Sequence, residues 1–330
     1  MENAQLRIEK WGYVFDLIIN EAWKYQFLTY PNPAVGAAVI VKNQIFTGVH
    51  KKAGEPHAEV HALWEAYRAF HDAPELYTSK EIHEYLKKHH NGFFNDANVY
   101  VTLEPCAHEG KTPSCAYLLK ELKPKSVSIG WPDPIKGHGG GVEILKNSGI
   151  DVKILNDKRC FHLIEPFIKW QNRFVFYKLA LTMNGAITGG YISSDESLDW
   201  VHNIRDKIDL LVIGGNTVRI DRPTLDARRV NGKAPDVLIY SKNDGIERDI
   251  PLFNVKNRKV FIEDSLEKLE DYKFIMIEGG ERLYNEIKHM VDWKVFIVSP
   301  KFANRFNFRS EDEFEILHTN QSSDLIVFGR

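Results

Sequence analysis

The chain contains few cysteines, no long apolar run and no excess of either charge. Three cysteines occur among 330 residues, and this odd, sparse count argues against a disulfide framework and favours a reducing cytosol. No stretch approaches the roughly 20 apolar residues of a membrane-spanning helix, and the first residues lack the basic and apolar segments of a secretory signal. Lys and Arg number 43 against 45 Asp and Glu, so no basic field attracts nucleic acid. These absences predict a cytoplasmic protein that binds neither membrane nor nucleic acid.

Two separated segments combine the residue types of a catalytic zinc site. His57 and Glu59 lie in the sequence His-Ala-Glu, and Cys106 follows a proline and precedes Cys115. One histidine and two thiolates supply three ligands for Zn²⁺ and leave the fourth tetrahedral position open to water. Glu59 can exchange protons with that water without being a ligand. The pattern predicts a hydrolytic deaminase in which Glu59 is the general acid and base.

The spacing of the two cysteines narrows this prediction. Eight residues separate Cys106 from Cys115, whereas the common motif of nucleobase deaminases has two. Three segments, YPNPAVG (30–36), HKKAGEPHAEVHAL (50–63) and VTLEPCAHEGKTPSC (101–115), resemble the riboflavin-biosynthesis deaminases. The resemblance implies a bifunctional pyrimidine deaminase and reductase. It covers most of the chain and is strongest over residues 1–135.

The resemblance also implies a course for the reaction and roles for pocket residues. Zinc lowers the pKa of its bound water from 15.7 toward about 7, so this water can attack the ring carbon that bears an amine. Glu59 would move the protons and help ammonia leave. By resemblance, five residues line the pocket for the pyrimidine and its phosphoribosyl group: Asn32, His50, His108, Lys111 and Asp133.

The periodicity of apolar residues in the first half predicts alternating helices and strands. The predicted elements are a first helix with Trp11 to Ala22 on its apolar face, strands at 37–41 and 45–49, a helix from about His57, a strand at 98–103 and a helix from Cys115. The N-termini of the last two helices would point at the metal, where unpaired N–H groups stabilise thiolate. With the resemblance, this predicts a cytidine-deaminase-like α/β/α domain over residues 1–155.

The segment between the two zinc motifs is longer than the resemblance implies. Residues 70–97 are rich in His, Lys and Glu and are interpreted as an insertion with a surface helix at 76–88. We expect its histidines (His83, His89 and His90) to form a solvated face rather than a second metal site. His61 lies one helical turn past His57, but the three-ligand set is complete without it. Cys160 is expected to be a small buried side chain.

A linker helix over 156–171 is predicted to precede a second domain over 172–330. Apolar runs at 174–180, 210–213 and 274–277 predict strands, and the last two runs lead to paired glycines that can expose N–H groups to a phosphate. No G-x-G-x-x-G follows a strand to open a helix, so a standard Rossmann site is not expected, and the glycine-rich stretch at 137–141 is interpreted as a loop. This half resembles the reductase domain of the same family, which implies a dihydrofolate-reductase-like α/β fold that uses NADPH.

The resemblance assigns site residues in this half as well. The residues implied for the phosphoribosyl substrate are Lys178, Arg205, Leu225, Arg228 and Glu278; those implied for NADPH are Ala180, Tyr191, Thr217, Asp221, Ser241 and the loop Gly280, Glu281, Arg282, Leu283, Tyr284, Asn285 and Glu286. Arginine suits phosphate because its planar guanidinium donates two hydrogen bonds at once. NADPH would deliver a hydride to the ring-opened ribose and leave a ribityl chain. Pairing of two copies through this domain would fit the resemblance.

The second half also departs from the family pattern. Asn184 stands where an Asp is expected, Tyr191 where a Trp is expected, and Asp226 where a Thr is usual, while a Ser before the aromatic residue is absent. The segment 182–191 is also shorter than its family counterpart. Either Ser193 or Ser194 replaces the absent Ser, or the reductase is slow or altered.

Three functions therefore stay open. The first is the bifunctional enzyme, and the second is a deaminase alone that acts on this substrate or on another nucleotide or tRNA base. The third is a structural zinc module joined to a nucleotide-binding or scaffolding domain. The near-neutral charge and the cysteine spacing oppose a tRNA substrate. Glu59 and the open coordination position oppose a structural zinc site.

Overall fold

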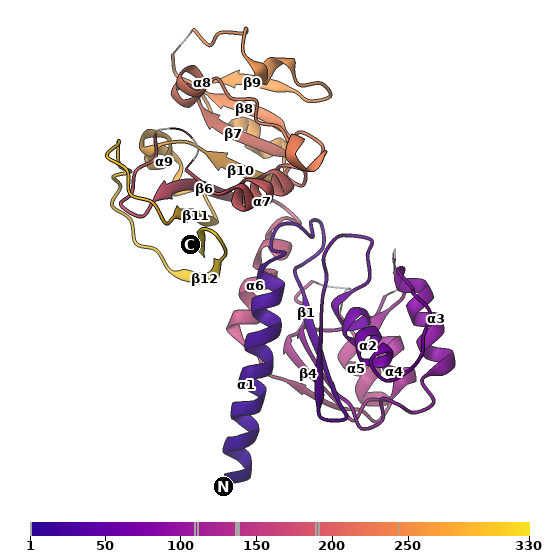
Figure 1. Ribbon diagram of the computed structural model, residues 1–330. Helices are drawn as coiled ribbons and strands as arrows, with labels where there is room; N and C mark the ends of the chain where they lie inside the picture. The colour runs from indigo at the N-terminus through magenta and orange to yellow at the C-terminus, as the bar shows by residue number, and fades with distance from the viewer. Residues whose placement is uncertain are drawn as a thin grey trace. The chain divides into compact units, whose positions relative to one another are not determined.

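The protein folds into two compact units, Met1–Ile168 and Lys169–Arg330 (Figure 1). The computed structural model describes residues 2–108, 110, 112–135, 139–188, 190, 192–243 and 245–330. Within these residues, no helix combines the length and apolar character needed to cross a membrane.

The first unit is built on a five-stranded sheet with the strand order β2-β1-β3-β4-β5. Its strands are β1 (Gly36–Val41), β2 (Gln44–Val49), β3 (Asn98–Leu103), β4 (Ser126–Trp131) and β5 (Asp151–Ile154), and its helices are α1 (Glu2–Trp23), α2 (Ala58–Arg68), α3 (Ser79–His89), α4 (Cys115–Leu122), α5 (Gly141–Asn147) and α6 (Lys158–Lys169). Strand β1 is antiparallel to both of its neighbours, whereas β3, β4 and β5 run parallel. Every element predicted for this half is present.

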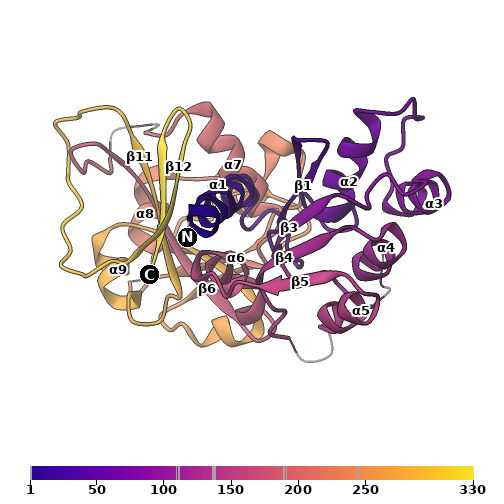
Figure 2. The same ribbon diagram turned by 90° about the horizontal axis from the view of Figure 1, so that it is seen from below.

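Helices cover both faces of this sheet, with α1 and α6 on one face and α2 to α5 on the other (Figure 2). Glycines mark the close approaches between the layers. A Cβ atom on Gly36 of β1 would lie 2.2 Å from the carbonyl oxygen of Ile18 in α1, and one on Gly130 of β4 would lie 2.4 Å from the sulfur of Cys160 in α6. Cys160 is fully buried, which confirms its interpretation as a small core residue. The layers form the predicted α/β/α arrangement.

The ends of two predicted helices differ from expectation. His57 is the N-cap of α2 with an extended backbone and does not lie in the first turn, whereas Glu59 does. Helix α3 begins at Ser79, three residues later than predicted, because Thr78 forms a capping box with Glu81. A side chain at an N-cap faces past the end of the helix, so the position of His57 directs its ring toward the cysteines.

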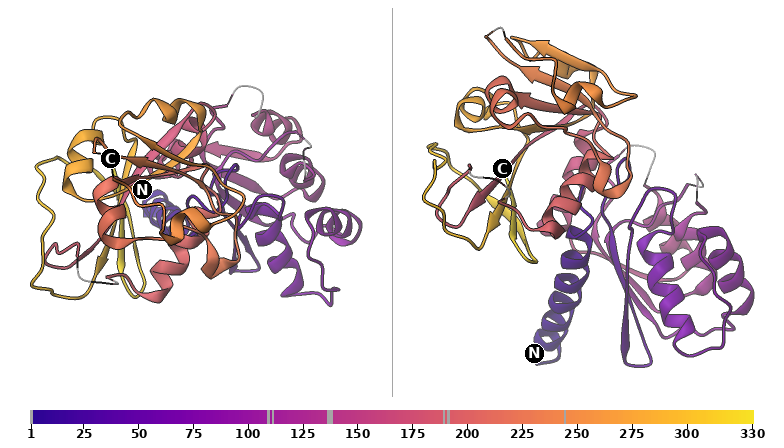
Figure 3. Two further views of the ribbon diagram at one scale, coloured as in Figure 1. Left: turned by 90° about the horizontal axis from the view of Figure 1, so that it is seen from above. Right: turned by 45° about the horizontal axis from the view of Figure 1, so that its top comes forward.

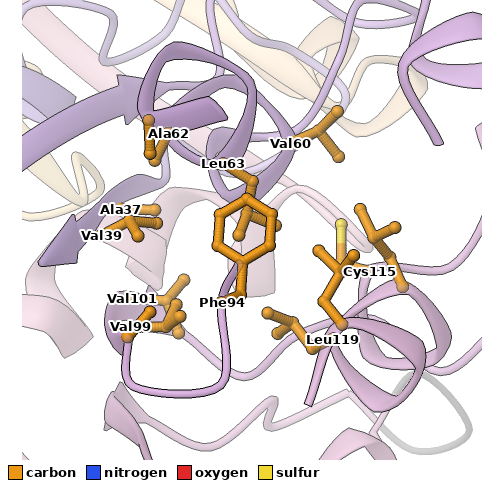
Figure 4. Packing of buried hydrophobic residues seen from close by; sticks show 14 of the residues in the cluster. Ala37, Val39, Val60, Ala62, Leu63, Phe94, Val99, Val101, Cys115 and Leu119 are labelled. Carbon is orange, nitrogen blue, oxygen red and sulfur yellow. The ribbon is translucent and has the colours of Figure 1, made fainter. Parts of the chain in front are cut away.

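The segment 70–97 contributes to the core of the first unit. Phe94 is fully buried, and Figure 4 shows its ring among Leu63 of α2, Leu119 of α4 and Val101 of β3. His83 is 2% exposed, so the prediction that it belongs to a solvated face was wrong. The reason is that α3 packs against α2 and α4 and buries the side of the helix that carries Ile82, His83 and Leu86.

The second unit contains an eight-stranded mixed sheet with the order β12-β13-β11-β6-β10-β7-β8-β9. Its strands are β6 (Phe174–Thr182), β7 (Leu210–Gly214), β8 (Asp236–Tyr240), β9 (Val260–Glu263), β10 (Phe274–Glu278), β11 (Trp293–Ser299), β12 (Ile316–Gln321) and β13 (Leu325–Gly329); its α-helices are α7 (Asp195–Arg205), α8 (Gly215–Asp221) and α9 (Glu281–Ile287), and its 3-10 helices are η1 (Arg228–Val230), η2 (Pro251–Asn254) and η3 (Glu267–Asp271). In sheet order, β11, β6, β10, β7, β8 and β9 run parallel to one another. At the other edge of the sheet, β13 is antiparallel to both β11 and β12 (Figure 3).

Alternate residues of the central strands face two separate cores. Tyr177, Ile277 and Val212 belong to the core that is completed by Leu283 and Tyr284 of α9. The opposite face carries aromatic side chains that contact one another: Phe174, Phe176, Phe274 and Trp293. Both faces of the central strands are therefore buried, which explains their nearly continuous apolar sequences. The prediction of an α/β fold holds for this half too.

Candidate active sites

Three protein ligands for one metal ion come together in the first unit. The Nδ1 atom of His57 lies 3.7 Å from the sulfur of Cys106 and 3.4 Å from that of Cys115. Tetrahedral zinc at its usual bond lengths would separate N from S by about 3.6 Å. Among the residues described, these three are the one group of His, Cys, Asp or Glu whose ligand atoms all lie within 4.8 Å of one another. The residues fit zinc, and three ligands leave its fourth position open.

The local structure orients these ligands. The Oγ1 atom of Thr112 lies 3.1 Å from Nε2 of His57, so Nδ1 is the nitrogen that faces the cysteines. The backbone N–H of Cys115, at the start of α4, donates to the sulfur of Cys106 at 3.4 Å. Hydrogen bonds from Cys115, and the proximity of His57, outweigh burial and lower the pKa of the Cys106 thiol to about 4. The largest effect is the hydrogen bond from the Cys115 side chain, and the backbone N–H at the start of α4 adds the smaller stabilisation that the predicted helix N-terminus implies. The same hydrogen bond, with burial, raises the pKa of the Cys115 thiol.

Glu59 lines the same cavity as the metal ligands but is not one of them. Its side chain is 4% exposed in the first turn of α2. Burial raises the pKa of the Glu59 carboxyl to about 7, although His57 and the backbone N–H of Glu59 itself lower it. A carboxyl group with that pKa can both accept and release a proton near neutral pH, as a general acid and base must.

A cavity of about 310 Å³ connects the ligands with the predicted pocket residues. Asn32, His50, His108 and Asp133 all line it, together with Glu59. The Nδ2 atom of Asn32 donates to Nε2 of His50 at 3.1 Å, and Nδ1 of His50 donates to the carbonyl oxygen of Pro56 at 3.2 Å. Burial, with the nearby His57, lowers the pKa of His50 to about 4, so His50 is neutral. Lys111, the remaining predicted pocket residue, lies outside the described residues.

Two residues that hold this site together were not predicted. The carboxylate of Glu104 accepts hydrogen bonds from the backbone N–H groups of Asp133, Gly140 and Val142, which ties Asp133 to the start of α5. Thr112 orients the His57 ring through its hydroxyl group. Both residues lie within the segment 101–115, which resembles the family, so their position was available from sequence. Their hydrogen bonds, however, depend on chain segments brought together by folding.

In the second unit, three of the predicted substrate residues form one buried ionic cluster. The carboxylate of Glu278 lies 3.0 Å from Nη2 of Arg205 and 3.2 Å from Nζ of Lys178. Burial raises the pKa of Glu278, but Arg205 and Lys178 outweigh it and bring the pKa to about 2. Strands β6 and β10 are neighbours with Lys178 opposite Glu278, so the sheet itself sets this pair.

The remaining two substrate residues lie on the segment that follows α8. Arg228 binds the carboxylate of Asp226, and the carbonyl oxygen of Asp226 accepts from Nη1 of Arg205 at 3.5 Å. Leu225 is buried and has a left-handed backbone, with φ of 55°. The segment is thus linked to the ionic cluster through Arg205.

The residues predicted to bind NADPH are distributed along the carboxyl ends of parallel strands, where ligands of open α/β sheets bind. Thr217 and Asp221 belong to α8, directly after β7, and Ser241 follows β8. Residues 280–286 follow β10, and Ala180 lies in β6. Several side chains of residues 280–286 have protein partners: Tyr284 donates to Asp312, Tyr240 donates to Glu286, and Ser310 donates to Asn285. Residues 281–286 lie in α9 and do not form a loop, and the N–H of Tyr284 already donates to the carbonyl oxygen of Gly280. The backbone N–H groups that can serve a cofactor are therefore those of the first turn of α9. Tyr191 lies outside the described residues.

Asn184, one of the departures in the second half, has a structural reason. Its amide nitrogen donates to the carbonyl oxygen of Ala303 at 2.9 Å, and its amide oxygen accepts from the N–H of Ala303 at 3.1 Å. An aspartate has no donor for the first of these bonds. Ser194 is the N-cap of α7 and accepts from the N–H of Ser197. That hydroxyl is committed to the helix cap.

Sequence comparisons agree with the division of the chain into two units. Residues 9–131 match the cytidine and deoxycytidylate deaminase zinc-binding region, and residues 173–329 match the RibD C-terminal domain. The riboflavin biosynthesis protein RibD of Aquifex aeolicus is 30% identical over 298 residues, which cover 84% of this chain and 77% of that protein. RibD of Synechocystis is 32% identical over 226 residues, but this match spans only 55% of its length and 65% of this chain.

Solved structures are similar over nearly the whole chain. The diaminohydroxyphosphoribosylaminopyrimidine deaminase/5-amino-6-(5-phosphoribosylamino)uracil reductase of Thermotoga maritima has a TM-score of 0.66 at 25% identity. The match covers 96% of this chain and 97% of that one. Acinetobacter baumannii RibD gives a TM-score of 0.61, also at 25% identity, over 96% and 97% of the two chains.

Fold, zinc site and sequence similarity define a zinc-dependent pyrimidine deaminase domain joined to a dihydrofolate-reductase-like reductase domain. The chain belongs to the RibD family, the bifunctional deaminase/reductases of riboflavin biosynthesis. In that family the reductase domain uses a nicotinamide cofactor, and the substrate is a phosphoribosyl-pyrimidine.

Proposed function

We propose that this protein deaminates 2,5-diamino-6-(5-phosphoribosylamino)pyrimidin-4-one and then reduces the ribosyl group with NADPH. The product is 5-amino-6-(5-phosphoribitylamino)uracil. The observation that carries the proposal is the cavity of about 310 Å³, which is lined by Glu59 and the zinc ligands His57 and Cys106 together with Asn32, His50 and Asp133. The pyrimidine carries amine and carbonyl groups at its edge. The amide, imidazole and carboxylate groups that line the cavity can form hydrogen bonds with them. The similar Thermotoga maritima protein is named for the same pair of reactions.

In the deamination step the chain supplies proton transfer and orientation. Zinc held by His57, Cys106 and Cys115 would lower the pKa of a bound water to about 7. Glu59 accepts a proton from the attacking water and passes it to the ring nitrogen. It then takes the remaining proton of the hydroxyl group now on the ring carbon and delivers it to the departing amine. Water enters and ammonia leaves, so the exocyclic nitrogen is exchanged for oxygen. Neutral His50 and Asn32 hold the ring by hydrogen bonds, while Asp133, His108 and Lys111 contact the rest of the substrate.

In the reduction step the chain supplies binding and electrostatics. NADPH provides the hydride, and the residues proposed to hold it are Ala180, Tyr191, Thr217, Asp221, Ser241 and 280–286. Glu278, held between Lys178 and Arg205, accepts hydrogen bonds from ribose hydroxyl groups. Arg228 is exposed enough to bind the phosphate with its planar guanidinium. Leu225, on the same segment as Arg228, is proposed as a further contact to this substrate.

The setting of the enzyme follows from the same reasoning. We propose a cytoplasmic protein, since none of its three cysteines forms a disulfide. We also propose a deaminase domain over 1–155 with an insertion at 70–97, a linker helix over 156–171 and a reductase domain over 172–330. A small-molecule substrate is the proposed partner, and two copies pairing through the reductase domain stay a prediction.

Isotope labelling tests both steps in one reaction. The zinc-loaded protein is given the diamino-pyrimidinone substrate in water labelled with a heavy oxygen isotope, with NADPH deuterated at the transferable position. We expect mass spectrometry to show heavy oxygen on the pyrimidine and deuterium on the ribityl chain. Heavy oxygen without deuterium would reduce the protein to a deaminase, and product with neither label would refute the proposal.

A further inference from the structure

Beside the ionic cluster of the second unit, which Lys178, Arg205 and Glu278 form, the carboxylate of Asp226 pairs with the exposed Arg228. The Oδ1 atom of Asp226 lies 2.7 Å from Nη1 of Arg228. The side chain of Asp226 is 16% exposed and that of Arg228 is 55% exposed. Arg205 contacts the same segment, since it donates to the carbonyl oxygen of Asp226 at 3.5 Å. A partly buried anion thus binds the cation that extends furthest toward solvent.

The other cations of the cluster are already engaged. Arg205 and Lys178 both bind the buried carboxylate of Glu278, at 3.0 and 3.2 Å. His202 is buried, and burial together with Arg205 lowers its pKa to about 4, so it adds no charge at neutral pH. Arg228 therefore remains the guanidinium best able to bind an incoming anion, and Asp226 is its partner in the absence of that anion.

The backbone around Asp226 is fixed, so the pair is not an accident of two mobile side chains. The guanidinium of Arg258 donates to three carbonyl oxygens, those of Thr224, Leu225 and Leu252. These bonds hold the left-handed backbone of Leu225, directly before Asp226. A non-glycine residue rarely adopts a left-handed conformation, and the conformation persists where the surroundings enforce it. The carboxylate is thus presented from a rigid segment, whereas the exposed Arg228 side chain can rotate.

We propose that Asp226 is a resident counter-anion that occupies Arg228 until the phosphate of the substrate displaces it. The inference rests on the proposed function, in which Arg228 binds that phosphate. A carboxylate and a phosphate compete for the same donors, and like charges placed together disfavour binding. Asp226 thereby weakens the contribution of the phosphate to affinity, so the reductase site distinguishes phosphorylated from unphosphorylated ligands less strongly than Arg228 alone would allow.

The test removes the charge of Asp226 and keeps its shape. Asp226→Asn retains an acceptor oxygen, and Asp226→Ala removes it. Asp199→Asn is the matched control, because Asp199 pairs with the neighbouring Arg229 and loses the same charge outside the cluster. Affinities for the phosphoribityl product and for the same product without phosphate are measured by isothermal titration without NADPH. The KM and kcat for reduction of the deaminated intermediate, and ammonia release from the deaminase, are measured in parallel.

We expect both Asp226 variants to bind the phosphorylated product about threefold to tenfold more tightly, with a matching fall in KM and unchanged kcat. Affinity for the unphosphorylated product, ammonia release and all values for Asp199→Asn should stay as in the parent protein. A weaker phosphorylated complex in both variants would mean that Asp226 positions Arg228, and would overturn the inference. So would an equal gain for both products.

Arg228→Gln separates this inference from the function beneath it. If Arg228→Gln weakens the phosphorylated complex and the Asp226 variants do not strengthen it, the counter-anion role fails while the phosphate role of Arg228 stands. If Arg228→Gln leaves the affinity for the phosphorylated product unchanged, the phosphate assignment and the counter-anion role both fail.

Discussion

The sulfur of Cys115 lies 3.4 Å from Nδ1 of His57, although 58 positions separate the two residues in the chain. His57 is the N-cap of α2, and Cys115 is the first residue of α4. The starts of α2 and α4, two helices that cover the same face of the sheet (Figure 2), therefore bring the ligands together. The ligands come from distant segments that folding brings together. Substitution of one ligand should therefore reduce the metal content more than it changes the fold.

The first prediction concerns the metal. Cys115→Ser should abolish stoichiometric zinc binding and ammonia release, because serine is a much poorer ligand for Zn²⁺ than thiolate. Cys160→Ala is the control, since Cys160 is buried against Gly130 and is not one of the three ligands. Zinc is measured by atomic absorption on purified protein. Equal zinc content in Cys115→Ser and the parent would contradict the assignment of Cys115.

The second prediction concerns Glu59. Glu59→Gln should retain zinc and lose ammonia release by a factor of about 10² to 10⁴, the usual contribution of a general acid and base. Reduction of the deaminated intermediate should be unaffected, because that reaction belongs to the second unit. Metal analysis and both activities are measured on one preparation. Loss of zinc in this variant would show that Glu59 is a ligand or supports the ligands.

The parts of the molecule predicted well from sequence are those specified by local pattern. The turn between β1 and β2 is an example: Lys42 and Asn43 both have positive φ, of 49° and 61°, as a tight hairpin turn between two strands requires. The zinc ligands were predicted because each of their two motifs, His57 with Glu59 and Cys106 with Cys115, combines specific residue types within a short stretch of chain.

The parts that sequence could not supply depend on tertiary contacts. His83 has the composition of a surface helix around it, yet it is buried because α3 packs on α2 and α4. The role of Glu104 requires the N–H groups of Asp133, Gly140 and Val142, all about 30 or more positions away. The pair of Asp226 and Arg228 is likewise local in sequence, but folding places it next to Arg205, which donates to the carbonyl oxygen of Asp226.

The third prediction concerns acid stability. The pKa of Glu278 falls from its ordinary value of 4.5 to about 2, since Arg205 and Lys178 outweigh the opposing effect of burial. A lowered carboxyl pKa gives stability that is present above pH 4.5 and is lost as the pH falls toward 2. The contribution is roughly 3 kcal/mol, because each tenfold change in proton affinity corresponds to about 1.4 kcal/mol. Urea unfolding of the reductase unit should therefore lose more free energy in acid in the parent than in Glu278→Gln.

Glu286→Gln serves as the control for that experiment. Glu286 also pairs with a lysine, Lys242, but its side chain is 42% exposed, so solvent screens the pair. Its replacement should leave the acid dependence of unfolding nearly as in the parent. An acid dependence of Glu278→Gln identical to that of the parent would show that the Glu278 cluster does not govern acid stability.

The fourth prediction concerns packing of α1 on the sheet. Gly36→Ala should destabilise the first unit by about 1–3 kcal/mol, because the new Cβ would lie 2.2 Å from the backbone oxygen of Ile18. Gly12→Ala is the matched control, and we expect it to stabilise the first unit rather than destabilise it. No atom lies within 4 Å of a Cβ at Gly12, and alanine favours a helix interior over glycine by up to about 1 kcal/mol. Thermal unfolding of both variants checks the pair, and equal shifts would contradict this account of the layer contact.

The most direct test of the bifunctional assignment is a paired assay of the zinc-loaded protein with the diamino-pyrimidinone ribosyl phosphate. Ammonia release and the absorbance of NADPH are followed in the same reaction. We predict that ammonia appears first and that NADPH is then consumed in equal amount, since deamination supplies the substrate of the reductase. Ammonia without NADPH consumption would contradict the bifunctional assignment and leave a deaminase with an inactive second domain.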